Sequence, residues 1–384
     1  MSSSSTYAQA QPRKYEQFST RIAFFIAGFT MSAWAPLVPL AKQRAGLDDG
    51  ALGLLLLCLG VGSIVAMPMA GFLTSRFGCR RVILVAGTAL CLVMPFLAIA
   101  SNLWSLMLAI LVFGAAIGGV DCAMNIQAVI VERASGQAKM SGFHGLFSVG
   151  GIVGAAGMTA LLSLDLSAVQ AVLCVVAITA VALLAAGPHL LREGSGSGGP
   201  LFAVPHGIVL FLGVVCFIVF QTEGAILDWS AVYLVGSHGM QAAYAGLGYA
   251  TFAATMTLGR LTGDAIVTRL GGPRVVIYGG ALAAVGMALS ILAPGWQLAL
   301  VGYGLVGAGC SNIVPVLFTA VGRQKVMPQN VAVPAMTSLG YLGILMGPAA
   351  IGFIAHLSNL SIALAVLVLL LMYVSFSGRK LARV

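Results

Sequence analysis

Charged residues are scarce in this chain. They make up 8% of its 384 residues, and only ten residues are Asp or Glu. A soluble domain carries about a quarter charged residues, so this composition cannot cover a surface that faces water. The scarcity excludes a soluble globular protein and indicates a chain that lies in lipid.

Patterns that mark catalytic, nucleotide-binding and metal sites are also missing. The sequence contains no Walker motif and no nucleophile–base constellation, so we expect neither an enzyme nor an ATP-driven pump. The seven cysteines show no CxxC pair and no metal spacing, and only Cys79 lies in a loop. The other six lie in apolar segments: Cys58, Cys91, Cys122, Cys174, Cys216 and Cys310. We therefore expect no disulfide, no metal site and no cofactor.

The sequence does contain a succession of apolar runs. Hydrophobic residues make up 60% of the chain, and the runs are about 20 residues long, which is enough to cross a bilayer. Lipid offers no hydrogen-bond partner to an exposed backbone group, so each run must be a helix. The sequence predicts an all-α membrane protein with twelve transmembrane helices, at 21–41, 52–75, 82–100, 104–131, 144–164, 168–187, 206–235, 242–267, 274–293, 297–321, 331–356 and 360–377.

Polar segments divide these runs into two halves. The opening segment has no apolar core, so we expect a disordered cytosolic tail and not a signal peptide. The low-complexity stretch REGSGSGG at 192–199 predicts a flexible linker. The predicted divisions are a tail at 1–20, a six-helix bundle at 21–190, a cytosolic linker at 191–204, a second six-helix bundle at 205–377 and a basic cytosolic tail at 378–384.

The positive charges lie almost entirely on one side of the predicted membrane. Of the 19 Lys and Arg residues, all but Lys42 and Arg44 fall in segments on the side that holds both termini. This bias predicts an inner-membrane protein with both termini in the cytoplasm. It also accounts for the net charge of +9 without nucleic acid as a partner.

Short patterns recur between the two halves. The recurring pairs, at offsets of 193 to 195, are RFGCRR (76–81) with RLGGPR (269–274), Gly150 and Gly154 with Gly343 and Gly347, and Trp34 with Trp229. The recurrence indicates a duplicated six-helix unit and therefore two pseudo-symmetric bundles.

The first recurring loop carries a family resemblance. The stretch GFLTSRFGCRR at 71–81 resembles the signature G-x-L-x-D-R-x-G-R-K of the major facilitator superfamily, except that Ser75 replaces the acid. The resemblance implies two facing bundles that transport by alternating access, with this loop as part of the gate. The glycine at 78 permits a tight turn, and the arginines anchor the inner face, although they would also be expected from topology alone. The expected gating residues are Gly71, Arg76, Gly78, Arg80, Arg81 and the counterpart Arg269.

Four acidic residues fall inside the predicted spans: Asp121, Glu223, Asp228 and Asp264. An acid at the bilayer centre costs about 2.5–3.5 kcal/mol, so such residues normally face protein or water. Asp121 shares one helix face with Gly114, Gly118 and Asn125. We expect this face to line a central cavity where the acid and the amide bind a solute and a proton. The alternative is an acid that bonds to a neighbouring helix and specifies packing.

The seventh span contains two of these acids. Glu223 and Asp228 are five residues apart, or about 140° on a regular helix, so both would face one cavity only if Gly224 breaks the helix. Glu223 is the better cavity candidate, and the alternative for Asp228 is an interfacial position beside an anchoring Trp229. The other side chains expected at the solute site are Gln221, Trp34, Trp229 and Asn312, the last as the counterpart of Asn125.

Two further polar residues are assigned structural roles. Arg260 precedes Asp264 by four residues, which predicts an i,i+4 ion pair that is structural or gating and lies outside the solute site. His144 opens the fifth span, so we expect it at the membrane interface, with a pH switch as the alternative.

The fourth span indicates a branch of the superfamily. Its acid-x-x-x-Asn pattern, Asp121 and Asn125, resembles the fucose-permease branch of proton-linked sugar symporters. That branch has a second acid in its first helix, where this chain has Ala35, so Glu223 is the candidate second proton carrier. Three stretches are similar to a group of bacterial inner-membrane facilitators of poorly defined substrate: EGAILDW at 223–229, Val-Glu-Arg at 131–133 and HGLFSVG at 144–150.

The function expected from these features is proton-coupled symport of a small polar solute, such as a sugar, by a protein that works as a monomer in the lipid bilayer. Sodium is the alternative coupling ion. A proton-linked drug or metabolite efflux antiporter is a second candidate, but its signature arginine before Gly114 and its fifth-helix Gly-Pro pair, here Gly154-Ala155, are missing. A non-transporting membrane receptor on the same fold is a third.

Overall fold

The computed structural model describes residues 14–194, 203–241 and 244–382. In these ranges the chain forms helices and no strand. The helices of the first half are α1 (Lys14–Ala33), η1 (Ala35–Leu37), α2 (Val38–Ala45), α3 (Asp49–Phe77), α4 (Cys79–Ile99), α5 (Leu103–Ser135), α6 (Met140–Ser163), α7 (Ala168–Ala186) and η2 (Gly187–His189). Those of the second half are α8 (Gly207–His238), α9 (Leu247–Leu270), α10 (Gly272–Leu292), α11 (Trp296–Cys310), α12 (Ile313–Arg323), α13 (Gln329–Leu357) and α14 (Leu360–Leu381).

Twelve helical segments cross the molecule. Eleven of those described are long and apolar enough to span a membrane, with α1 to α2 forming one span and α11 to α12 another. The twelfth is α9, whose 24 residues include Arg260, Asp264 and Arg269 and are therefore less apolar. The predicted all-α fold with twelve crossing helices is confirmed.

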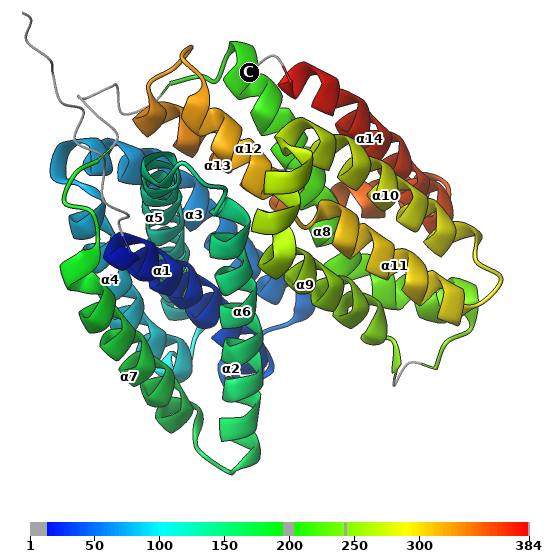
Figure 1. Ribbon diagram of the computed structural model, residues 1–384. Helices are drawn as coiled ribbons and strands as arrows, with labels where there is room; N and C mark the ends of the chain where they lie inside the picture. The colour runs from blue at the N-terminus through cyan, green and yellow to red at the C-terminus, as the bar shows by residue number, and fades with distance from the viewer. Residues whose placement is uncertain (1–13, 195–202, 242–243, 383–384) are drawn as a thin grey trace, which may run out of the picture.

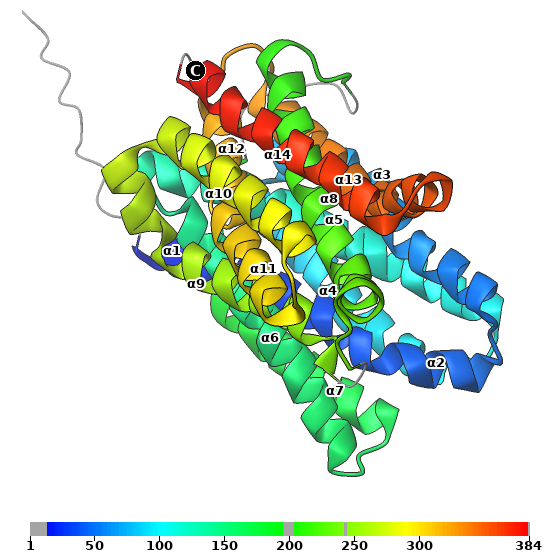
Figure 2. The same ribbon diagram turned by 90° about the vertical axis from the view of Figure 1, so that its right-hand side faces the viewer.

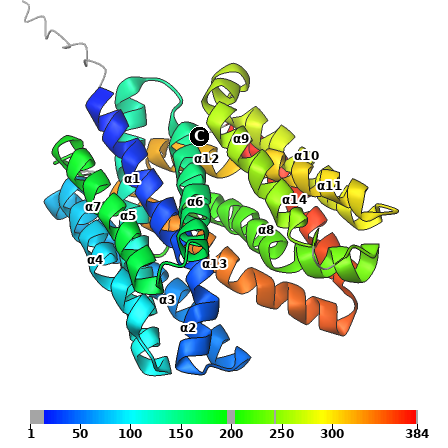
Figure 3. The ribbon, with the colours of Figure 1, turned by 90° about the horizontal axis from the view of Figure 1, so that it is seen from below.

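Each half of the chain forms its own bundle. Figures 1 and 3 show α1, α4, α5 and α7 on one side of the molecule and α8 to α11 with α14 on the other. The packing pairs α1 with α6, α3 with α5 and α4 with α7 recur in the second half as α8 with α13, α9 with α11 and α10 with α14. The two bundles therefore repeat one arrangement, as the sequence predicts.

Glycines at equivalent positions allow the closest of these contacts. Gly150 and Gly154 on α6 lie against the backbone of α1, and Gly343 and Gly347 on α13 lie against that of α8. A Cβ at any of the four positions would press into the neighbouring helix. This common packing explains why the two glycine pairs recur at one offset.

The two bundles meet along two helix pairs. α6 packs on α9, and α3 packs on α13, which lies beside it in Figure 2. We call the end of the molecule where α1 begins and α14 ends the terminal face. At this face Gly71 of α3 lies against the Asn330 carbonyl and the Pro334 ring of α13. Because Gly71 has no side chain, the backbone of α3 comes into direct contact with α13 there.

Two boundary predictions differ from the structure. Helix α1 begins at Lys14, inside the expected tail at 1–20, and α14 continues to Leu381, inside the expected basic tail. Residues 1–13 and most of the expected linker, 195–202, lie outside the described residues. Helix α8 is continuous through Gly224, so the break that would let Glu223 and Asp228 both face one cavity does not occur.

Candidate functional site

Arg260 connects the two bundles near the middle of the molecule. Its Nη2 lies 3.4 Å from Oε1 of Glu223 on α8, and its Nη1 donates to the Ser148 hydroxyl on α6 at 3.0 Å. Its Nε donates to the carbonyl of Ser311, at the break between α11 and α12, at 3.4 Å. One guanidinium therefore joins a side chain of the first bundle to two groups of the second.

The expected Arg260–Asp264 pair is not formed. Arg260 takes the partners just described, while Asp264 Oδ1 accepts from the backbone N–H of Gly142, 3.0 Å away, on α6. An exposed i,i+4 ion pair is worth only about 0.2–0.5 kcal/mol. A buried guanidinium requires several acceptors at once, and the bundle interface supplies them.

Asp121 and Asn125 lie buried on α5. They are 8% and 1% exposed, and Asn125 Nδ2 donates to the Asp121 carbonyl at 2.9 Å and approaches its carboxylate at 3.5 Å. Asn125 Oδ1 has no hydrogen-bond partner. Because buried polar atoms are usually paired, this amide oxygen is an acceptor that a ligand could satisfy.

Asp121 and Glu223 are carboxylates of different bundles, on α5 and α8. Asp121 is 8% exposed and the Glu223 side chain is 20% exposed. Both interact electrostatically with the buried Cys216 on α8. We take the region between these two helices as the candidate site.

The glycines beside Asp121 do not open onto that space. Gly114 and Gly118 lie against the backbone of α3 at Leu59 and Ser63, and the Ser63 hydroxyl donates to the Gly114 carbonyl at 2.8 Å. The prediction that the face shared with Gly114 and Gly118 lines a central cavity is wrong at these two glycines, because their small size serves close packing of α3 on α5.

The other predicted site residues do not form one cluster. Gln221 is buried on α8 against Gly347. Asp228 is exposed, and its neighbour Trp229 donates from Nε1 to the Pro348 carbonyl at 3.2 Å. Trp34 is buried, and its indole N–H has no partner.

Asn312 occupies a different kind of position from Asn125. It lies at the break between α11 and α12, and its Nδ2 donates to the Gly259 carbonyl of α9 at 2.9 Å and to the Ser311 hydroxyl at 3.0 Å. The bond to Gly259 ties the break to α9 and the bond to Ser311 lies within the break, whereas Asn125 bonds within its own continuous helix.

His144 is not at the membrane interface. Its ring is 9% exposed and lies 5.0 Å from the ring of Phe24 and 5.4 Å from that of Phe318, between centroids. Its Nδ1 lies 3.0 Å from the Met140 carbonyl. The prediction is wrong because α6 begins at Met140 and carries His144 into the contact with α12 of the other bundle.

Glu132, which lies one residue beyond the predicted span 104–131, is part of a contact between the bundles. Its Oε2 accepts from the backbone N–H groups of Lys139 and Met140, each at 2.8 Å, and its Oε1 accepts from the Thr319 hydroxyl of α12 at 2.5 Å. With Asp264 on Gly142, two carboxylates cap the free N–H groups at the start of α6. We call Glu132, Thr319, Asp264 and the first turn of α6 the α6 latch.

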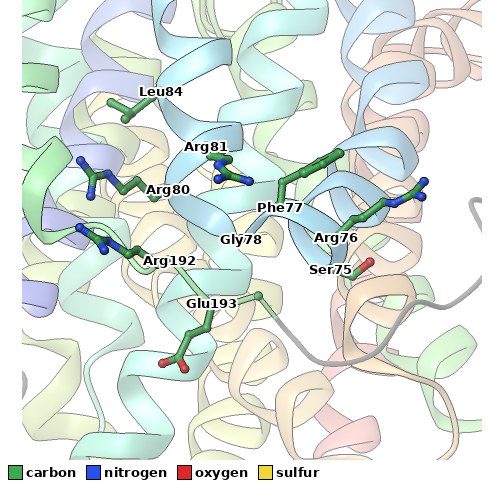
Figure 4. A pocket seen from close by; sticks show the side chains of 10 residues that line it. Ser75, Arg76, Phe77, Gly78, Arg80, Arg81, Leu84, Arg192 and Glu193 are labelled. Carbon is green, nitrogen blue, oxygen red and sulfur yellow. The ribbon is translucent and has the colours of Figure 1, made fainter.

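The signature loop docks on the chain that follows α7. Gly78 has φ 82°, and the N–H groups of Cys79 and Arg80 at the start of α4 donate to the carbonyls of Glu193 (3.2 Å) and Leu191 (2.7 Å). A surface cavity of about 620 Å³ lies between these segments. In Figure 4 the side chains of Arg80 and Arg192 point to the same side of it and Arg76 points away.

Replacing Gly78 by Ala is expected to destabilise the protein more than replacing Gly271. Gly78 has φ 82° and ψ 158°, and Gly271 has φ 80° and ψ 148°. Only glycine adopts this conformation readily, so each Ala costs about 1–3 kcal/mol of backbone strain. A Cβ at Gly78 would also collide with the Arg192 carbonyl, whereas at Gly271 it meets nothing within 4 Å. Thermal unfolding of the two purified variants tests this. Equal losses of Tm would contradict the prediction and show that the segment around Arg192 moves aside without a free-energy cost.

A sequence model of the Major Facilitator Superfamily matches residues 21–348. An MFS-type transporter of Yersinia pestis is 55% identical over 374 residues, covering 97% of each chain.

The chain belongs to the major facilitator superfamily. The membrane protein MosC of Rhizobium meliloti is 31% identical and aligns over 89% of this chain and 84% of its own. The superfamily and these relatives identify a membrane transporter and not an enzyme.

Solved structures share the fold at low identity. Two crystal structures of the Escherichia coli fucose:proton symporter FucP give TM-scores of 0.83 and 0.82 at 16% and 18% identity, each covering 97% of this chain and 99% of FucP. The human organic anion transporter MFSD10 gives 0.78 at 15% identity, covering 96% and 100%. These likenesses place the two six-helix bundles in the major facilitator fold.

Proposed function

We propose that this chain is a proton-coupled symporter of a small polar solute, working by alternating access in the inner membrane with both termini in the cytoplasm. The observation that carries the proposal is a membrane-embedded, largely buried carboxylate in each bundle: Asp121 on α5, 8% exposed, and Glu223 on α8, whose side chain is 20% exposed. Acids inside a membrane protein are costly and mark solute or ion pathways.

A carboxylate suits proton coupling because its proton affinity depends on its surroundings. Burial in a low-dielectric site favours the protonated form, and access to water favours the charged form. Asp121 is nearly enclosed, while the Glu223 side chain is 20% exposed. In a transport cycle that moves each carboxylate between a buried and a water-accessible environment, the carboxylates would take up and release protons together with the solute. FucP, which shares the fold, is a fucose:proton symporter, and this supports the same coupling ion.

The contacts between the bundles suit alternating access. The α6 latch closes the bundles against each other at the terminal face through Glu132–Thr319 and Asp264–Gly142. We take this face to be cytoplasmic, so the structure represents the state closed to the cytoplasm. One FucP structure with the same fold is in the outward conformation, which agrees. Rocking of one bundle against the other would open the latch and expose the site to the cytoplasm.

Transport and its coupling ion are tested in proteoliposomes. Ligands are first identified by thermal stabilisation of the purified protein in a screen of sugars, nucleosides and organic acids. We expect counterflow of the stabilising solute, and uptake driven by an inward proton gradient in sodium-free buffer but not by a sodium gradient at equal pH. Binding without counterflow would indicate a receptor, and uptake driven by an outward proton gradient would indicate an antiporter.

A further inference from the structure

Arg260 is the one Lys or Arg among the described residues whose side chain is buried, and the function proposed above does not use it. It is 7% exposed, on α9, between Ser148 of the first bundle and Glu223 of the second. A buried cation at a bundle interface has to be matched by negative charge. The question is whether Glu223 alone provides that match.

The ion pair between Arg260 and Glu223 is a weak one. A guanidinium has five N–H donors and binds a carboxylate best through two parallel bonds. Here one Nη2 approaches one oxygen, Oε1, at 3.4 Å. One N–H of Nη1 donates to the Ser148 hydroxyl, and the Nε N–H donates to the Ser311 carbonyl. One N–H on Nη1 and one on Nη2 therefore remain for a further acceptor.

Among the described Lys and Arg residues, the buried Arg260 is the one that pairs with Glu223. Glu223 interacts with Tyr249 on α9, Cys310 on α11 and Cys216 on α8, and Cys216 also senses Asp121 of α5. On the α6 side, Arg260 faces the His144 ring. When Glu223 takes up a proton, Arg260 loses its one paired carboxylate, and an incoming anion can restore the charge balance.

We propose that the solute carries a carboxylate, which binds Arg260 in place of Glu223 when Glu223 is protonated. This inference rests on the proposed symport function and names its substrate class: small hydroxylated monocarboxylates. The solute carboxylate takes both free guanidinium N–H groups, and the proton on Glu223 travels with it. A neutral solute would leave the buried Arg260 guanidinium without a negative partner when Glu223 is protonated. Protonation of Glu223 would therefore oppose the binding of a neutral solute.

The test compares matched probes on the purified full-length protein in lipid nanodiscs. One mixture contains gluconate, glycerate and lactate, and the other contains the corresponding alcohols glucitol, glycerol and 1,2-propanediol, each at 10 mM and pH 5.5. We expect the carboxylates to raise Tm by about 3 °C if they are present at roughly a hundredfold excess over Kd, and the alcohols to leave it unchanged. Arg260→Gln should lose the shift, and Arg323→Gln, at the exposed end of α12, should keep it.

Two further variants keep the result decisive if Arg260→Gln unfolds. Arg260→Lys retains the positive charge but lacks the two parallel N–H donors of the guanidinium, so it should bind the carboxylates at least tenfold more weakly. Glu223→Gln should show the same carboxylate shift at pH 5.5 and pH 7.5, whereas the natural protein shows it mainly at pH 5.5. A shift with the alcohols, no shift with either mixture, or an undiminished shift in Arg260→Lys would overturn the anion assignment. The symport proposal would still be judged separately, by counterflow of any solute.

Discussion

Asp121→Asn is expected to abolish accumulation of solute driven by the membrane potential while leaving solute exchange intact. The amide keeps the volume of the carboxylate, and the donor bond from Asn125 to the Asp121 carbonyl is made by the backbone, so the site keeps its shape. It can no longer carry a proton. A membrane potential of 100 mV is worth about 2.3 kcal/mol per charge, which corresponds to roughly 50-fold accumulation. We expect this factor to fall to about one, because the proton that remains on Glu223 only balances the charge of the solute carboxylate.

The measurement is uptake in proteoliposomes under an imposed membrane potential at equal pH on both sides, with counterflow at zero gradient as the parallel assay. Asp228→Asn is the matched control, because Asp228 is an acid on α8 whose side chain is exposed. It should accumulate solute as the natural protein does. If Asp121→Asn also accumulates solute to the natural ratio, the carboxylate of α5 is not a proton carrier.

Opening the α6 latch is expected to produce the second large effect. Two hydrogen bonds to these carboxylates cross between the bundles: the Thr319 hydroxyl donates to Glu132, and the Gly142 N–H donates to Asp264. Hydrogen bonds to a charged group contribute about 1.5–3 kcal/mol each. The Glu132→Gln, Asp264→Asn double variant should shift the balance between the closed and open terminal face by about 100-fold or more.

Spin labels placed on the terminal ends of α5 and α12 measure this shift as a distance distribution. The natural protein should populate mainly the short distance, and the double variant mainly a longer one. Asp165→Asn, in the exposed turn after α6, should leave the distribution unchanged. An unchanged distribution in the double variant would mean that packing of α3 on α13 holds this face closed by itself.

Local patterns in the sequence predicted the features that depend on neighbouring residues. Apolar runs located twelve crossing helices, because lipid forces each run to satisfy its own backbone. The glycine pairs at 150 and 154 and at 343 and 347 predicted the repeat, because each lets one helix approach another closely. The turn at Gly78 was predicted from the same kind of local requirement, and its φ of 82° confirms it.

Contacts between the two bundles could not be predicted from local sequence patterns. Arg260 and Asp264 have ideal spacing for an ion pair on one helix, yet each bonds to a residue more than 30 positions away. His144 and Glu132 lie at or near predicted span ends, where solvent is the usual neighbour, but the partner bundle covers both. Helical periodicity indicates which face a residue occupies. It does not indicate which helix of the other bundle meets that face.

The central claim is that acids on α5 and α8 face one aqueous space between the bundles. Single cysteines replacing Asp121 or Glu223, in a variant without the natural cysteines, can be exposed to a charged, membrane-impermeant thiol reagent in proteoliposomes. We expect the cysteines at 121 and 223 to react with the reagent, and we expect bound solute to slow both reactions. Leu108→Cys, on the exposed outer side of α5, should not react. Two unreactive cysteines at 121 and 223, indistinguishable from Leu108→Cys, would contradict it.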